Sequence, residues 1–128
     1  MPHTERPVLL YVEDEIFTQH LVESSLCEAG YDVQTASDGA EALEMLASLG
    51  PTLRGLVTDV DLGDCPNGWQ VAREARMVVP QLPVIYVSGA SAHEWREKGV
   101  ADSLMVAKPF SPDQISAAVA FFFARATQ

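Results

Sequence analysis

Short apolar runs alternate with longer helical patterns along most of the chain, and this alternation is the strongest constraint on its fold. Continuous apolar runs are typical of strands that are buried on both faces of a parallel sheet. Five βα units predict an α/β domain in which helices cover both faces of such a sheet. The expected strands are Val8–Val12, Asp32–Ala36, Leu56–Thr58, Pro83–Val87 and Leu104–Ala107.

Helical periodicity fills the intervals between these strands. The clearest stripe has apolar residues at i, i+3, i+4, i+7 and i+8 over residues 115–123. Ser111 and Pro112 predict its start, as N-cap and first helical residue. Further helices are expected over residues 40–47, 71–78 and 92–98. For the helix after the first strand, we expect one buried face formed by Phe17, Leu21, Val22, Leu26 and Ala29.

Right-handed crossovers leave few ways to connect five parallel strands. We adopt the flavodoxin-like strand order 2-1-3-4-5, which is a known order for such sheets and not one derived from this sequence. The expected architecture is a three-layer (βα)5 sandwich over residues 7–126, a single domain with no output domain in this chain. Open α/β sheets bind ligands beyond the carboxyl ends of their strands. The residues that follow each strand are therefore the candidates for a site.

Acidic residues follow two strands that are neighbours in the chosen order. Glu13 and Asp14 come after the first strand, and Asp59 and Asp61 come at and after the end of the third. Clustered carboxylates repel one another and raise their own pKa values unless a cation neutralises them. Hard oxygen ligands in small number suit Mg²⁺. We therefore expect Glu13, Asp14 and Asp59 to hold a magnesium ion.

Two further polar residues are expected to flank these acids. Ser88 follows the fourth strand and Lys108 follows the fifth. With a phosphoryl group drawn to the metal, Asp59 could act as a nucleophile and form an acyl phosphate. Lys108 would neutralise the phosphoryl oxygens and the Ser88 hydroxyl would donate a hydrogen bond to one. Phosphoryl transfer needs chiefly positioning and charge neutralisation, which this set of residues supplies.

Four segments in order resemble the receiver domain of two-component response regulators: residues 8–15, 56–62, 84–90 and 108–110. The resemblance covers about Pro7 to Ala124. It implies that Asp59 accepts a phosphoryl group from a histidine kinase or a histidine phosphotransfer protein. It also implies that Asp14 and Asp59 ligate Mg²⁺ through carboxylates, Glu13 directly or through water, and Asp61 through its backbone carbonyl.

The same resemblance implies how the phosphorylated state is read. Ser88 would be the hydroxyl switch, and Lys108, whose peptide bond to Pro109 would be cis, would bind the phosphoryl group. The readout would reach the face formed by the fourth helix, fifth strand and fifth helix, and from there an unknown downstream protein. The chain departs from the family at Glu13, where Asp is usual, at Gly63, where Pro is usual, and at Met105, where Tyr or Phe is usual. The stretch from Gly99 to Lys108 is also longer than usual.

Composition excludes several classes of partner. Eighteen acidic residues against eight Lys and Arg give a formal net charge of -10, which repels nucleic acid. The longest apolar run, residues 117–124, is far below the roughly 18 residues of a membrane helix. Residues 1–7 carry no apolar segment, so we expect no secretion signal, and Cys27 and Cys65 form neither a disulfide framework nor a zinc pattern. We expect a cytoplasmic protein that is a monomer or weak homodimer.

Two alternatives to a phosphoacceptor switch are open. Met105 and the longer stretch before the last strand suggest a receiver-like interaction module that acts without phosphorylation. The Asp59-Val60-Asp61 pattern also fits the nucleophile pair of haloacid-dehalogenase-like phosphohydrolases, but that family places the pair after its first strand and has longer chains. We expect an autocatalytic phosphoacceptor and not a turnover enzyme.

Overall fold

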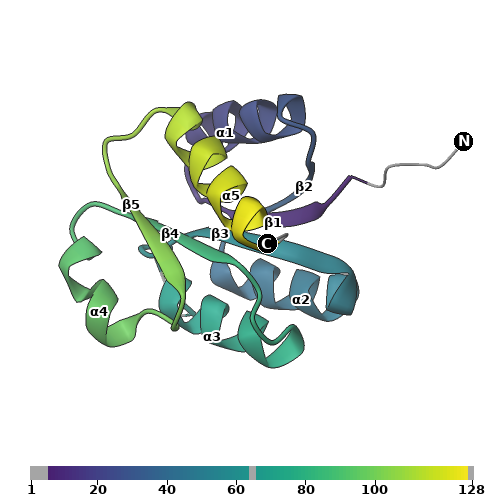
Figure 1. Cartoon of the computed structure of the whole chain (residues 1–128). Helices are drawn as coiled ribbons and strands as arrows, with labels where there is room; N and C mark the ends of the chain where they lie inside the picture. Colours follow the sequence, from purple (N-terminus) through teal and green to yellow (C-terminus); the bar gives the residue numbers. More distant parts are fainter. Residues whose placement is uncertain (1–5, 64–65, 127–128) are drawn as a thin grey trace, which may run out of the picture.

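The computed structural model describes residues 6–63 and 66–126 and has a five-stranded parallel sheet at its centre (Figure 1). The order β2-β1-β3-β4-β5 is the predicted one. The strands are β1 (Val8–Val12), β2 (Asp32–Ala36), β3 (Leu53–Asp59), β4 (Val84–Ser88) and β5 (Ser103–Ala107).

Helices cover both faces of the sheet. In Figure 1, α1 (Ile16–Glu28) and α5 (Pro112–Ala126) lie on one side, and α2 (Gly39–Leu49) and α3 (Gly68–Val78) lie on the other. Short helical turns complete the connections: η1 (Gly50–Thr52), η2 (Ala92–Glu94) and α4 (Trp95–Lys98). Side-chain caps begin the longer helices α1, α2 and α3, because the first backbone N–H groups of a helix have no partner within it. Asp38 caps α2, and Asn67 forms a capping box with Gln70 at the start of α3.

The sheet separates two apolar layers because successive residues of a strand point to opposite faces. In β1, Leu10 and Val12 belong to the layer under α2 and α3, whereas Leu9 and Tyr11 belong to the layer under α1 and α5. This two-sided burial is why β1 and β4 read as continuous apolar runs. Trp69 and Tyr86 pack on each other in the first layer, with ring centroids 4.7 Å apart.

The predicted buried face of α1 was wrong at three of its five positions. Phe17 and Leu21 face solvent, 77% and 58% exposed, and Ala29 is exposed at the end of the helix. Val22 and Leu26 are buried as expected, together with Gln19. Gln19 is only 5% exposed because its amide donates to the backbone oxygen of Glu13 (2.9 Å), which turns this polar residue inward and the two large apolar ones outward.

Other boundaries differ by small amounts. β3 begins at Leu53 instead of Leu56, β4 runs from Val84 to Ser88, and β5 begins at Ser103. The predicted stripe of α5 is confirmed, with Ile115, Val119 and Phe122 buried.

Within residues 6–63 and 66–126, no helix combines the length and apolar character needed to cross a bilayer. Cys27 is exposed, and Cys65 lies outside the described residues.

Candidate functional site

Strand register brings the predicted residues to one edge of the sheet. Val12 pairs with Thr58, so Glu13 and Asp59 follow at the same level. Asp59 pairs with Val87 across β3 and β4, and Ser88 pairs with Ala107 across β4 and β5. Lys108 follows directly, and its backbone N–H donates to the Ser88 oxygen (3.0 Å). The carboxyl ends of four strands therefore meet at a single site.

Three carboxylates converge at this edge. Glu13, Asp14 and Asp59 each offer an oxygen, and these oxygens lie within 4.8 Å of one another. Glu13 and Asp59 are buried, whereas Asp14 is exposed, so the cluster opens to solvent on one side. Buried acids at this spacing destabilise one another when ionised. Hard oxygen donors in small number, with an open side for water and phosphate, fit Mg²⁺.

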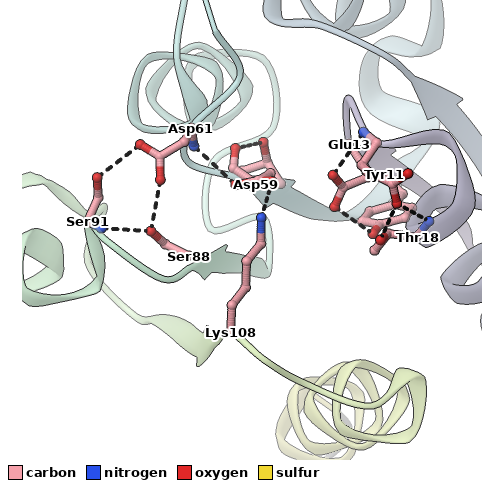
Figure 2. A network of polar contacts seen from close by, with 10 residues as sticks. Tyr11, Glu13, Thr18, Asp59, Asp61, Ser88, Ser91 and Lys108 are labelled. Atoms are coloured by element: carbon pink, nitrogen blue, oxygen red, sulfur yellow. Dashed lines mark hydrogen bonds and ion pairs between the residues drawn. The ribbon is translucent and has the colours of Figure 1, made fainter.

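Both carboxylate oxygens of Asp59 are held from neighbouring segments (Figure 2). Lys108 Nζ donates to Oδ2 (2.7 Å), and the Asp61 backbone N–H donates to Oδ1 (3.1 Å). Burial raises the pKa of Asp59, and the hydrogen bond and charge of Lys108 oppose this. Burial would lower the pKa of Lys108, but the hydrogen bond and charge of Asp59, with the charges of Glu13 and Asp14, together outweigh burial and raise the pKa. The Lys108–Pro109 peptide bond is cis, as the family resemblance implies.

Glu13 is held by two donors on its own segment. Tyr11 Oη donates to Oε1 (3.2 Å), and the Glu15 backbone N–H donates to Oε2 (3.1 Å). Burial raises the pKa of Glu13 to about 7, with the Glu15 N–H opposing and the charge of Asp59 adding to the rise. Without a cation, Glu13 is therefore partly protonated near neutral pH. Tyr11 and Gln19 orient this residue, yet nothing in the sequence separates Tyr11 from an ordinary packing residue.

The Ser88 hydroxyl belongs to a second group of polar contacts, visible on the left of Figure 2. It donates to Asp61 Oδ2 (3.2 Å), and the Ser91 hydroxyl donates to Asp61 Oδ1 (3.0 Å). The Ser91 backbone N–H in turn donates to Ser88 Oγ (3.1 Å). Ser91 was not singled out from the sequence; its place three residues after Ser88, in a Ser-Gly-Ala-Ser turn, is the signal that could have found it.

A pocket of about 480 Å³ lies beside the acids, between α1 and the segment that leads into α5. Its polar lining comes from Glu13, Glu15, Thr18 and Lys108, and its apolar lining from Leu21, Val22, Pro109, Phe110 and Pro112. Glu15 caps α1 and accepts hydrogen bonds from Thr18, which lower the pKa of Glu15. Leu21, one of the outward-facing residues of α1, thus lines the same pocket as Glu13 and Lys108.

The protein-family comparison agrees with this geometry. A family model described as "Response regulator receiver domain" matches residues 9–120. The chain belongs to that family. Receiver domains are signalling switches of two-component systems and not turnover enzymes, and phosphorylation and magnesium binding at an acidic pocket are typical of them. This membership argues against the haloacid-dehalogenase-like alternative.

Solved receivers share the fold over nearly their whole length. A response regulator receiver protein from Sinorhizobium medicae is 42% identical, with a TM-score of 0.86, and the match covers 92% of this chain and 94% of that one. The chemotaxis protein CheY4 of Vibrio cholerae is 25% identical, with a TM-score of 0.79, over 91% of this chain and 98% of that one.

Two curated relatives are much longer than this chain. The transcriptional regulatory protein PhoP of Bacillus subtilis, for alkaline phosphatase synthesis, is 34% identical over 114 residues, which are 87% of this chain and 46% of the relative. The sensor kinase CckA of Brucella abortus is 33% identical over 113 residues, 87% of this chain and 12% of the kinase. The chain thus spans about half the length of the regulator and a small part of the kinase.

Proposed function

We propose that this chain is the phosphoacceptor switch of a two-component phosphorelay, with residues 7–126 as its receiver domain. Asp59 accepts the phosphoryl group, Lys108 binds it, and Ser88 reads its presence. The donor is the phosphohistidine of a histidine kinase or of a phosphotransfer protein. The observation that carries this proposal is the meeting of Asp59 with two further carboxylates within 4.8 Å and with Lys108 at 2.7 Å.

The transfer is a displacement at phosphorus. A carboxylate oxygen of Asp59 forms a bond to phosphorus while the phosphorus–nitrogen bond of the donor histidine breaks. The imidazole leaves with the electron pair, and Asp59 becomes an acyl phosphate. The Lys108 ammonium moves its hydrogen bond from Asp59 to a phosphoryl oxygen, where it neutralises charge that would otherwise repel the nearby acids.

The residues at the sheet edge fit a magnesium ion. The ion would be held by the carboxylates of Asp14 and Asp59 and by Glu13, directly or through water. The backbone carbonyl of Asp61 would be the remaining protein ligand. When bound, magnesium neutralises the acids and draws the phosphoryl oxygens toward the site. No other cofactor is proposed.

The readout uses the strands that carry the contacts. When the Ser88 hydroxyl turns to a phosphoryl oxygen, the segment that follows β4 shifts. When Lys108 binds the phosphoryl group, the end of β5 shifts as well. The face formed by α4, β5 and α5 then binds a downstream protein. We also propose a cytoplasmic protein that is a monomer or weak homodimer.

Stoichiometric labelling with acetyl phosphate tests the acceptor. Asp59→Asn should abolish Mg²⁺-dependent labelling, because an amide nitrogen and oxygen are poor nucleophiles toward phosphorus. Asp32→Asn, the same change at an exposed residue at the start of β2, should leave labelling unchanged. Full labelling of the Asp59 variant would show that another residue accepts the phosphoryl group.

One observation favours a phosphorylation-independent module as the second candidate. Met105 stands where receivers usually carry an aromatic ring, and it is half-buried against the core under α2 and α3. Beryllofluoride, a mimic of the phosphoryl group, separates the two candidates. Chemical-shift changes along β5 on adding it with Mg²⁺ support the switch, and an unresponsive β5 supports the module.

A further inference from the structure

We propose that Asp61 is a positioning residue whose carboxylate, together with Ser91, holds the Ser88 hydroxyl away from the phosphoacceptor in the unphosphorylated chain. We call this group of three residues the Ser88 latch. The inference rests on the proposed function, since it concerns how the switch is restrained before Asp59 is phosphorylated.

The latch occupies the hydrogen-bonding capacity of Ser88. The serine hydroxyl has a single proton, which it donates to Asp61 Oδ2 (3.2 Å). Its oxygen accepts the Ser91 backbone N–H (3.1 Å). Figure 2 shows the hydroxyl turned toward Asp61 and Ser91, on the side away from Lys108. Ser88 is fully buried, so these bonds set the direction of its side chain.

Ser91 holds the acceptor of that proton in place. Its hydroxyl donates to the other carboxylate oxygen of Asp61 (3.0 Å), so the carboxylate is bonded through both oxygens. The Asp61 backbone N–H meanwhile donates to Asp59 Oδ1 (3.1 Å). The same residue therefore contacts the phosphoacceptor with its backbone and the switch hydroxyl with its side chain.

A phosphoryl group on Asp59 competes directly with the latch. It brings roughly two negative charges and strong acceptor oxygens close to the Asp61 carboxylate. One hydroxyl proton cannot serve both acceptors, so Ser88 must leave Asp61 before it can bond to the phosphoryl group. The latch thus lowers the population of the active conformation and weakens binding of any phosphoryl mimic.

A double-mutant cycle on beryllofluoride affinity tests the latch, because removing Asp61 also removes a repulsive charge. With Mg²⁺ present, Asp61→Ala should tighten beryllofluoride binding roughly three- to tenfold, the range for one exchanged hydrogen bond. In a Ser88→Ala background, where no hydroxyl is held, the gain should shrink to the part due to charge. Ser91→Ala changes no charge and should tighten binding less, but in the same direction. Ser24→Ala, at an exposed serine in α1, is the matched control.

The outcomes separate the latch from the proposed function. If Asp61→Ala changes the affinity by the same factor in both backgrounds, the effect is charge repulsion alone and the latch is wrong. If the unsubstituted chain binds no beryllofluoride with Mg²⁺, the phosphoacceptor function fails and the latch fails with it.

A second measurement needs neither metal nor mimic. The three-bond scalar couplings across χ1 of Ser88 should report one rotamer in the unsubstituted, unphosphorylated chain and averaged rotamers in Asp61→Ala. Averaged couplings in the unsubstituted chain would overturn the latch, because Ser88 would then not be held.

Discussion

Glu13, which stands where receiver domains usually carry Asp, is buried at the acidic site. Its carboxylate accepts hydrogen bonds from Tyr11 Oη and the Glu15 backbone N–H. Burial raises its pKa to about 7, and the neighbouring Asp59 charge contributes. A cation that needs the ionised carboxylate must therefore displace a proton near neutral pH.

Magnesium affinity should accordingly rise with pH across the Glu13 titration. The expected gain lies between about pH 6 and about pH 8, because Glu13 loses its proton there in the metal-free chain. Glu13→Gln should bind magnesium more weakly and show little pH dependence in this window. Calorimetric titrations at several pH values measure both effects, and an equally steep dependence in the variant would assign the proton to another group.

The raised pKa of Glu13 also makes the stability of the fold depend on pH. A carboxyl group whose pKa rises from 4.5 to about 7 on folding binds more protons in the folded chain than in the unfolded chain. The free energy of unfolding without magnesium should therefore fall as pH rises from 4.5 to about 7, and the raised pKa of Asp59 acts in the same direction. Denaturant unfolding with and without Mg²⁺ measures this, since saturating magnesium should remove most of the fall.

Among the elements, the start of α3 lies directly against the backbone of Asp59. Gly68 donates its N–H to the Val60 oxygen (2.9 Å), and a Cβ at this position would lie 2.2 Å from the Asp59 carbonyl oxygen. No side chain can be accommodated there unless helix or strand moves. The absence of a side chain at Gly68 therefore sets the distance between α3 and the end of β3.

Gly68→Ala should destabilise the fold by about 1–3 kcal/mol, the usual cost of overpacking, and should slow acetyl phosphate labelling because Asp59 is displaced. Gly89→Ala is the control for stability, since a Cβ there would meet only Lys108 Cβ at an ordinary 3.6 Å. Urea unfolding of both variants compares them. If the Gly68→Ala and Gly89→Ala variants were equally stable, α3 would be able to move away from β3 with no loss of folding free energy.

The strands and the strand-end residues could be predicted because both follow from general rules. Burial on two faces makes β1 and β4 apolar throughout, and parallel strands end at the same edge. The face of α1 could not be predicted, because the hydrogen bonds that the buried Gln19 amide donates to Glu13, Ala36 and Ser37 leave no mark in the hydropathy pattern. Ser91 was missed for a similar reason: its contact with Asp61 joins residues 30 apart in the chain.

On the molecule as a whole, the outward-facing side of α1 is an exposed apolar surface that could contact other proteins. Ile16, Phe17 and Leu21 are exposed there, and Leu21 also lines the pocket that contains Glu13 and Lys108. Receiver domains interact with histidine kinases or phosphotransfer proteins. If Asp59 is the acceptor, as proposed above, an apolar surface on α1 is suited to hold such a donor during the transfer.

Phe17→Ala should therefore slow labelling by a phosphotransfer protein that labels the unsubstituted chain, by roughly fivefold or more as for an interface anchor. Labelling by acetyl phosphate should be unchanged, because this small donor needs no docking surface. Phe121→Ala, at an exposed aromatic residue of α5, is the matched control. Equal loss with both donors would instead indicate damage to the acidic site.

The two tryptophans occupy very different settings. Trp69 is buried against Tyr86 in the core, whereas Trp95 is half-buried after the turn that contains Ser91, with its indole N–H donating to Ser103 Oγ at the start of β5 (2.9 Å). Trp95 therefore lies between the turn after Ser88 and the start of β5, and a shift of either segment would change the surroundings of its indole. The chain therefore carries its own pair of fluorophores, one suited to follow switching and the other to follow unfolding, with no added dye.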